Sequence, residues 1–314
     1  MSNLRCAVIG VGYLGRFHAQ KYAALDGVDL VGVYDMHLPQ AELVAQELNV
    51  AVFSNLEELV QSVDAVSIAT TTSAHYDVAF FCLQQGLHVL IEKPITETTE
   101  QARTLIELAK NNQCLLQVGH LERFNPAYQA FLPRMKVIRL IEAQRLASFK
   151  KRGSEVDVIL DLMIHDLDLV LSLVKSPVIH IHAEGLSVMT DAIDLANVSL
   201  RFANGCVAHL TASRVYSGSE RLTRIYQEDG YYALNYGQQK LTRFIPNPEA
   251  QNGVFLQSEE ISCHAQDALH AQIAEFVSAI QNGTSIQVDG PAALNALDLA
   301  LQIQSHIQKE KSFG

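Results

Sequence analysis

The sequence predicts an α/β protein in which a doubly wound parallel sheet is followed by an α+β domain with a large, mostly antiparallel open sheet. Three observations predict this fold class. Short apolar runs alternate with helical periodicity over the first 120 residues, a glycine-rich turn follows the first run, and several strand-like runs beyond residue 126 follow one another without intervening helices. We therefore expect two domains, at residues 1–120 and 121–314.

The composition excludes several classes of protein. Apolar residues make up 48% of the chain and charged residues 18%, which is the balance of an ordinary compact protein. The net charge of −11 argues against nucleic-acid binding through a broad basic surface. No apolar stretch reaches the roughly 18 residues that a membrane span needs. The five cysteines form no C-x-x-C pair, so we expect a cytoplasmic protein with neither a zinc site nor a disulfide framework.

The expected strands of the first domain are short and rich in β-branched residues. They cover residues 5–9, 29–34, 64–69, 88–91 and 114–118, and a weaker run at 50–53 would complete six. Because helical segments separate them, the strands should run parallel, with helices on both faces of the sheet.

Capping signals mark the helices between these strands. Pro39 stands where a first helical residue is expected, and Gly86 fits a helix end that needs a left-handed residue. Two capping boxes are expected further along, from Ser54 with Glu57 and from Thr98 with Gln101.

The second domain begins after Asn125-Pro126, which marks a helix start. Consecutive strands favour antiparallel pairing, so this part is expected to be of α+β type. The expected order is a strand at 139–149, a helix at 156–174, strands at 178–188, 197–202, 206–214, 222–227 and 231–236, a helix at 267–281, a short strand at 285–288 and a helix at 291–309.

The glycine-rich turn has the spacing G-x-G-x-x-G between a strand and a helix, the arrangement of a Rossmann dinucleotide-binding turn. Its glycines permit a tight turn and close approach to a pyrophosphate, and the helix N-terminus offers N–H groups to the phosphates. Asp35 ends the second strand, where a carboxylate binds the adenosine ribose and repels a 2′-phosphate, so NAD is favoured over NADP. The expected contacts are Gly10, Gly12, Tyr13, Leu14, Gly15 and Asp35.

The helix at 156–174 is apolar almost all round except for a polar stripe. At about 100° per residue, Asp161, His165 and Asp168 fall on one side of it. Charged groups on a buried helix need a polar cavity or partners, so the stripe indicates either an active site or an internal hydrogen-bonded network. One histidine with two aspartates is too few ligands for a closed zinc site, and His180 with His182 reads as a solvent-facing pair.

Two motifs carry a resemblance to a known family. Glu92-Lys93-Pro94 follows the fifth strand, and Asp161-x-x-x-His165-x-x-Asp168 lies on the apolar helix. With these motifs the chain resembles the glucose-fructose oxidoreductase / inositol dehydrogenase / MocA family over nearly its whole length. The resemblance implies a catalytic pair of Lys93 and His165, with Asp161 beside them, and further cofactor contacts at Thr70, Thr71, His75, Glu92 and Lys93, although the family's Thr-Pro-Asn turn is altered here to Thr70-Thr71-Thr72.

Finer similarity points to one branch of that family, which oxidises the 3-hydroxyl of UDP-N-acetylglucosamine on the way to lipid A. It is carried by residues 119–126, 161–168 and 211–214. The resemblance implies substrate contacts from Arg123, Arg152, Asp168 and Arg214. Several cationic residues are expected near this site, and they either hold a diphosphate or are solvated charges at strand edges. They are Lys150, Lys151, Arg152, Arg214, Arg221 and Arg224.

Three functions are compatible with these residues. The first is an NAD-dependent sugar-nucleotide dehydrogenase in which His165, assisted by Asp161, removes the hydroxyl proton and Lys93 steadies the alkoxide, although either Lys93 or His165 can take the proton. The second is a dehydrogenase of a free polyol such as inositol, and the third is a catalytically silent NAD-binding sensor. The large sheet would suit a homodimer or homotetramer.

Overall fold

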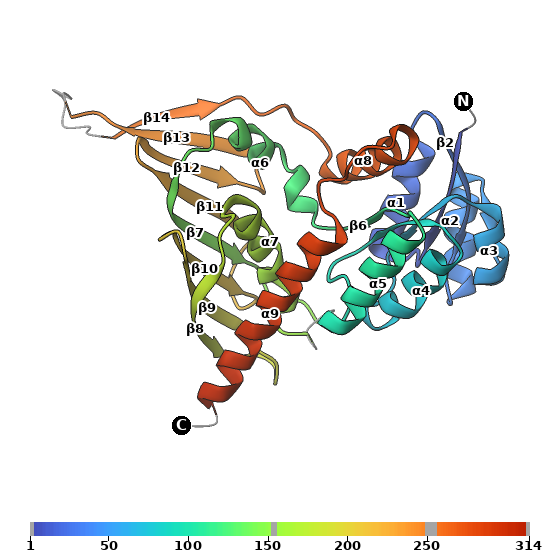
Figure 1. The fold of residues 1–314 in the computed structure, drawn as a ribbon, viewed down its shortest axis with the longest axis horizontal. Coiled ribbons are helices and arrows are strands. Elements are labelled where there is room, and N and C mark those ends of the chain that lie inside the picture. The colour runs from blue at the N-terminus through green and yellow to red at the C-terminus, as the bar shows by residue number, and fades with distance from the viewer. Residues whose placement is uncertain (1–2, 152–155, 249–255, 312–314) are drawn as a thin grey trace. The chain divides into compact units, whose positions relative to one another are not determined.

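The structure, a computed structural model, describes residues 3–151, 156–248 and 256–311. The chain forms two compact units, residues 1–121 with 267–294 and residues 122–266 with 295–314 (Figure 1). Residues 267–294 pack with the first unit although the sequence pattern placed them in the second domain.

The first unit contains a six-stranded parallel sheet in the order β3-β2-β1-β4-β5-β6. From β1 the chain first adds β2 and β3 on one side, and it then returns to add β4, β5 and β6 on the other side. This is the strand order of a doubly wound sheet, which confirms the expected fold class. The strands are β1 (Leu4–Ile9), β2 (Val28–Tyr34), β3 (Ala51–Val52), β4 (Ala65–Ile68), β5 (His88–Ile91) and β6 (Leu116–Val118). The helices between them are α1 (Tyr13–Ala23), α2 (Leu38–Leu48), α3 (Leu56–Ser62), α4 (Thr72–Gln84) and α5 (Thr99–Asn111).

Most of the expected helix signals act where the sequence placed them. The capping box of Thr98 and Gln101 is present, and Gly86 follows α4 with φ +81°. Pro39 is the second residue of α2, not the first, because the helix begins at Leu38.

The expected capping box of Ser54 and Glu57 is wrong by one residue. Asn55 is the N-cap of α3, and its side-chain oxygen accepts the N–H of Glu58 at 2.8 Å. The Glu58 carboxylate in turn accepts the Ser54 N–H at 3.3 Å. An asparagine caps as well as a serine, so adjacent Ser and Asn residues leave the start of the helix undecided in sequence.

Helix α8 (Ala268–Asn282) belongs to the first unit because its apolar face completes that unit's core. Ile273 and Phe276 are buried in one cluster with Tyr22 of α1. The N-cap Asp267 pairs with Lys21 at 2.7 Å. The expected strand at 285–288 is wrong: these residues have no strand structure, and the isolated bridge to Gln117 is formed by the next residue, Asp289.

The second unit is built on an eight-stranded sheet in the order β14-β13-β12-β11-β7-β10-β9-β8. All neighbours pair antiparallel except β10 and β7, so the expected mostly antiparallel sheet is confirmed. The expected strands are β7 (Ile138–Leu146), β8 (Val178–Leu186), β9 (Leu195–Phe202), β10 (Val207–Ser213), β11 (Glu220–Gln227) and β12 (Gly230–Asn235). The sequence pattern did not predict β13 (Lys240–Pro246) or β14 (Leu256–Ile261), and the exposed, polar β14 lacks the apolar alternation that signals a half-buried strand.

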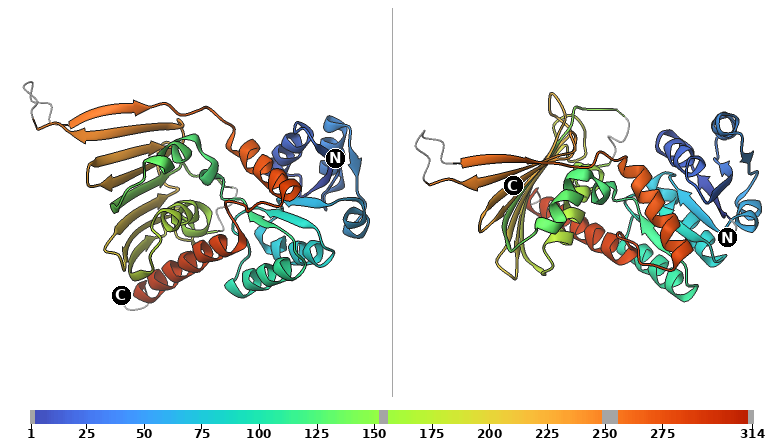
Figure 2. Two further views of the ribbon diagram at one scale, coloured as in Figure 1. Left: turned by 45° about the horizontal axis from the view of Figure 1, so that its top comes forward. Right: turned by 90° about the horizontal axis from the view of Figure 1, so that it is seen from above.

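Helices cover one face of this sheet (Figure 2). They are α6 (Pro126–Phe131), α7 (Ile164–Leu173) and α9 (Gly290–Lys311), with short 3-10 turns at Leu121–Phe124 and Leu132–Arg134. Phe131 of α6 packs edge-on against Tyr232 of β12 at 5.2 Å between ring centroids. The neighbouring residues of the strands point to the opposite face, where Tyr231 stacks on Phe244 at 4.5 Å and contacts Tyr226 in a tilted arrangement at 5.0 Å between ring centroids.

The helix expected at 156–174 is not a single α-helix. Residues 152–155 lie outside the described residues, and a π-helical turn, η3 (Ile159–Met163), precedes α7. A π-turn bonds i→i+5, so the 100° spacing that put three polar residues on one stripe does not hold through it.

Candidate active site

The glycine turn has the geometry that a dinucleotide phosphate needs. Gly10 has φ +81°, and a Cβ there would lie 2.8 Å from the backbone nitrogen of Thr70. A Cβ on Gly15 would lie 1.8 Å from the Gly10 carbonyl oxygen, so only glycine lets α1 approach β1 this closely. A Cβ on Gly12, the N-cap of α1, meets nothing within 4 Å, and no side chain caps the helix there. The open cradle and uncapped helix start fit a pyrophosphate.

Asp35 lies at the end of β2, beside this turn. One carboxylate oxygen accepts the N–H of Val11 at 2.8 Å, and the other accepts the N–H of His37 at 2.8 Å. These two bonds fix the orientation of a carboxylate that remains partly exposed. The arrangement fits a group that accepts hydrogen bonds from ribose hydroxyls.

Other expected cofactor contacts lie in the first turn of α1 and in the connection from β4 to α4. Tyr13 is 69% exposed and packs edge-on against Phe17 at 5.2 Å, and Leu14 is half-buried. Thr70 is half-buried against Gly10, and Thr71 is the exposed N-cap of α4.

Glu92-Lys93-Pro94 follows β5 at the carboxyl edge of the sheet. The Glu92 N–H donates to the Ile68 carbonyl at 3.0 Å, and the Glu92 carboxylate contacts His18 of α1 at 3.1 Å. Lys93 is half-buried. His75 is buried beneath this segment, with its Nδ1 2.8 Å from the Pro94 carbonyl oxygen, and burial lowers the pKa of His75.

In the second unit, the three residues of the expected polar stripe lie on the π-turn and on the helix that follows it. Asp161 lies on the π-turn and His165 in the first turn of α7, and both are half-buried. Asp168 is 1% exposed and forms a two-pronged ion pair with Arg123, at 2.6 and 2.8 Å. Two expected substrate contacts, Arg123 and Asp168, are thus bound to each other. π-turns are frequent at functional sites, which supports a functional role for Asp161 and His165.

Asp166, the residue after His165, belongs to a buried ion network that was not among the expected site residues. The guanidinium of Arg145 binds both oxygens of Asp166 at 2.9 Å and Oε1 of Glu122 at 3.0 Å. Arg221 reaches the same Glu122 oxygen at 3.2 Å. Burial raises the pKa of Asp166, whereas the two carboxylates raise the pKa of Arg145 against its burial. The sequence does indicate that Arg145 is buried, because it lies at every second position after the inward-facing Ile141 and Ala143 and therefore on the same face of the strand.

The remaining cationic candidates differ in their surroundings. Arg214 is 5% exposed, 3.7 Å from Asp194, and donates to the Val156 carbonyl. Burial would raise the pKa of Asp194, but the N–H groups of residues 188–190 and the Thr190 hydroxyl outweigh it and lower the pKa to about 2. Arg152 lies outside the described residues.

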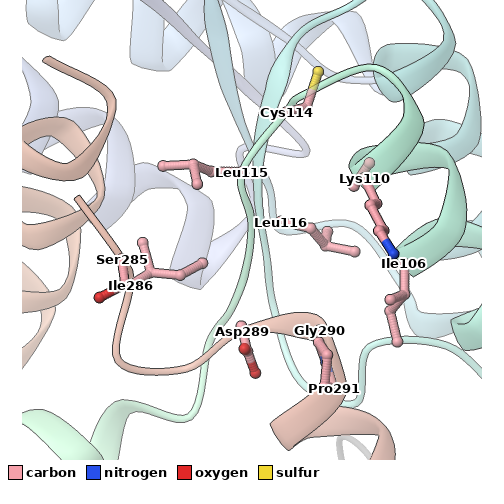
Figure 3. A pocket seen from close by; sticks show the side chains of 11 residues that line it. Ile106, Lys110, Cys114, Leu115, Leu116, Ser285, Ile286, Asp289, Gly290 and Pro291 are labelled. Atoms are coloured by element: carbon pink, nitrogen blue, oxygen red, sulfur yellow. The ribbon is translucent and has the colours of Figure 1, made fainter. Parts of the chain in front are cut away.

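Two further features do not include the expected catalytic and cofactor residues: the histidine pair of β8 and a cavity of the first unit. His180 and His182 are exposed on β8, and no cluster of three potential metal ligands occurs within residues 3–151, 156–248 and 256–311. A cavity of about 320 Å³ in the first unit is lined by α5, β6 and the start of α9, with Lys110 and Asp289 among its polar groups (Figure 3). None of the expected site residues lines it.

Comparison with known proteins identifies the family. Residues 4–120 match the model of an oxidoreductase family with an NAD-binding Rossmann fold, and residues 134–233 match the GFO/IDH/MocA C-terminal domain. The chain is 40% identical to UDP-N-acetylglucosamine 3-dehydrogenase of Acidithiobacillus ferrooxidans, over 98% of both chains. The chain belongs to the GFO/IDH/MocA family.

Other comparisons agree with this assignment. The solved structure of that Acidithiobacillus enzyme has a TM-score of 0.94, covering 98% of this chain and 99% of the other. The chain is also similar to the scyllo-inositol 2-dehydrogenase (NAD(+)) of Bacillus subtilis, at 27% identity over 93% of this chain and 91% of the relative. A levoglucosan dehydrogenase in complex with NADH and L-sorbose shares the fold, with a TM-score of 0.87 at 18% identity, covering 99% of this chain and 98% of the other.

As a GFO/IDH/MocA protein, the chain is an NAD-binding oxidoreductase. Among the described residues, no helix combines the length and apolar character of a membrane span.

Proposed function

We propose that this protein is an NAD-dependent dehydrogenase that oxidises the 3-hydroxyl of UDP-N-acetylglucosamine to a 3-oxo sugar nucleotide, in the pathway to lipid A. One observation carries the proposal: the 40% identity with the Acidithiobacillus enzyme extends over nearly the whole of both chains. The inositol dehydrogenases share less sequence, at 27% or below.

Each candidate residue has a defined role in this proposal. NAD, when bound, supplies the acceptor for the hydride that leaves C3. His165 removes the proton of the 3-hydroxyl, and Asp161 orients the imidazole. Lys93 stabilises the charge that develops on that oxygen. Arg123, Arg152, Asp168 and Arg214 contribute to the substrate site, where Arg123 and Asp168 act together as a two-pronged ion pair.

The substrate assignment predicts strict dependence on the nucleotide. With NAD, the purified protein should oxidise UDP-N-acetylglucosamine with a kcat/KM at least about 100-fold above that for free N-acetylglucosamine, because the UDP moiety contributes binding energy that a free sugar lacks. An aminotransferase and glutamate remove the 3-oxo product and draw the oxidation forward, and mass spectrometry detects the 3-amino product. Oxidation of myo-inositol without any reaction of the sugar nucleotide would replace this proposal with a polyol dehydrogenase.

The cofactor preference is the second part of the proposal. NAD should bind more tightly than NADP in calorimetry, because Asp35 accepts from the ribose and repels a 2′-phosphate. Asp35→Ser should weaken NAD binding about 10- to 100-fold, the effect of losing a charged hydrogen bond, and narrow the gap to NADP. Asp26→Ser, which removes an exposed carboxylate that precedes β2 at the opposite end of the strand, serves as the control. Tighter binding of NADP by the unchanged protein would contradict the preference.

A homodimer or homotetramer is also part of the proposal. The face of the large sheet opposite α6 carries the aromatic stack of Tyr226, Tyr231 and Phe244, a group of side chains that favours association. A cytoplasmic setting, expected from the cysteine pattern, completes the proposal.

A further inference from the structure

A row of buried polar side chains crosses the first unit from α1 to the end of β5. His18 and Tyr22 lie one helical turn apart on α1, Ser67 lies in β4, and all three are 0% exposed. The Tyr22 hydroxyl lies 3.0 Å from Ser67 Oγ, which lies 3.1 Å from His18 Nδ1, and His18 Nε2 lies 3.1 Å from Glu92 Oε1. Such groups in an otherwise apolar core require hydrogen bonds, so the row is held together as a unit.

The direction of each hydrogen bond follows from what the atoms can do. A carboxylate only accepts, so His18 Nε2 carries a hydrogen and donates it to Glu92. In the neutral ring Nδ1 is then an acceptor, and Ser67 donates to it. Ser67 Oγ in turn accepts from Tyr22, whose pKa is raised by burial, so the phenol keeps its hydrogen. The hydrogens of Tyr22, Ser67 and His18 are each donated once, and each donation runs in the direction of Glu92.

The opposite arrangement leaves a buried group without a partner. A doubly protonated His18 would donate from Nδ1 to Ser67, whose oxygen can at the same time accept from Tyr22. The Ser67 hydrogen would then have only Tyr22 as an acceptor within the row, and turning there would displace the Tyr22 hydrogen. In either case one hydrogen at a site that is 0% exposed has no acceptor within the row, which is costly. The row therefore favours a single tautomer of His18.

The end of the row lies at the proposed cofactor site. The Glu92 side chain is 12% exposed and packs over Gly119, where a Cβ would lie 2.6 Å from Oε1. On the other side of Lys93, the Pro94 carbonyl accepts from the buried His75. Both neighbours of Lys93 are thus tied to imidazoles in the interior.

We propose that Tyr22, Ser67 and His18 form a one-way hydrogen-bond chain that locks the Nε2–H tautomer of His18 and thereby holds the Glu92 carboxylate in one orientation for NAD. His18 is a positioning residue in this scheme, since it acts through Glu92. The inference rests on the proposed role of Glu92 as a cofactor contact and is independent of the sugar substrate.

The tautomer is tested directly by ¹⁵N NMR of the full-length protein labelled at histidine. The His18 signals are assigned by their loss in His18→Gln. We expect a protonated Nε2 and an unprotonated Nδ1. A protonated Nδ1 would overturn the proposal. The measurement needs neither NAD nor substrate, so a wrong substrate assignment cannot be mistaken for its failure.

The positioning role is tested by calorimetric binding of NAD to variants shown to be folded by circular dichroism. His18→Ala should weaken binding about tenfold, and Ser67→Ala, which removes only a hydroxyl, about threefold. His18→Gln should restore most of the affinity, since its amide can donate to Glu92 and accept from Ser67. Gln272→Met, a buried polar residue of α8, is the matched control and should bind NAD normally.

Two results would reject the positioning role. Undiminished NAD affinity in both His18→Ala and Ser67→Ala would show that Glu92 does not depend on the chain. Equal losses in His18→Gln and His18→Ala would show that the hydrogen bond is not what matters.

Discussion

Replacing Lys93 by methionine, or His165 by alanine, is expected to lower kcat about 10²- to 10⁴-fold while NAD affinity stays close to that of the unchanged protein. Groups that move a proton or stabilise a developing charge act mainly in the transition state, so their loss appears in kcat. Lys93 lies at the carboxyl end of a central strand, where doubly wound sheets bind their ligands, and His165 lies in the first turn of α7, after the π-turn. Asp161→Asn should have a smaller effect, through the orientation of the imidazole.

Stopped-flow and steady-state rates with NAD and the sugar nucleotide measure this prediction, and calorimetry measures NAD binding. Lys110→Met, an exposed lysine of α5 beside the separate cavity, is the control and should keep full activity. Normal turnover in both the Lys93 and His165 variants would show that the reaction is carried by other residues.

Replacing Arg145 by methionine is expected to lower the free energy of unfolding by about 3–5 kcal/mol, the range for removing one partner of a buried ion pair. Arg145 is 4% exposed and is shared by two buried carboxylates, so its loss leaves both Asp166 and Glu122 with one partner fewer. Because burial raises the pKa of Asp166 above its unfolded value, stability falls as pH rises through that pKa. The variant should therefore recover part of its stability at mildly acidic pH.

Chemical denaturation of matched variants measures this loss in the free energy of unfolding. Arg221→Gln removes a half-exposed cation from the same Glu122 and should cost less than about 1 kcal/mol, as surface pairs do. Adding Asp166→Leu to Arg145→Met should restore part of the loss, because the double change removes a charge together with its partner. Equal stability of Arg145→Met and the unchanged protein would mean that the network does not stabilise the second unit.

The local parts of the fold and site were readable in the sequence. Strand and helix periods, the capping box at Thr98 and the glycine turn depend on residues within a few positions of one another. The start of α3 was misplaced because two adjacent residues, Ser54 and Asn55, can both cap a helix. The polar β14 was missed because an exposed edge strand has no buried face to impose alternation.

By itself, the sequence determined the fold class, the position of the dinucleotide turn and the residues that carry the family resemblance. Only the tertiary structure decided that α8 completes the first unit, that Asp168 is held by Arg123, and that His18 is joined to Glu92. The physical reason is distance along the chain. Arg123 and Asp168 are 45 residues apart and His18 and Glu92 are 74 apart, so their hydrogen bonds exist only after packing has brought the elements together. Periodicity shows which side chains are buried, whereas the partner of each buried polar group is set by the packed structure.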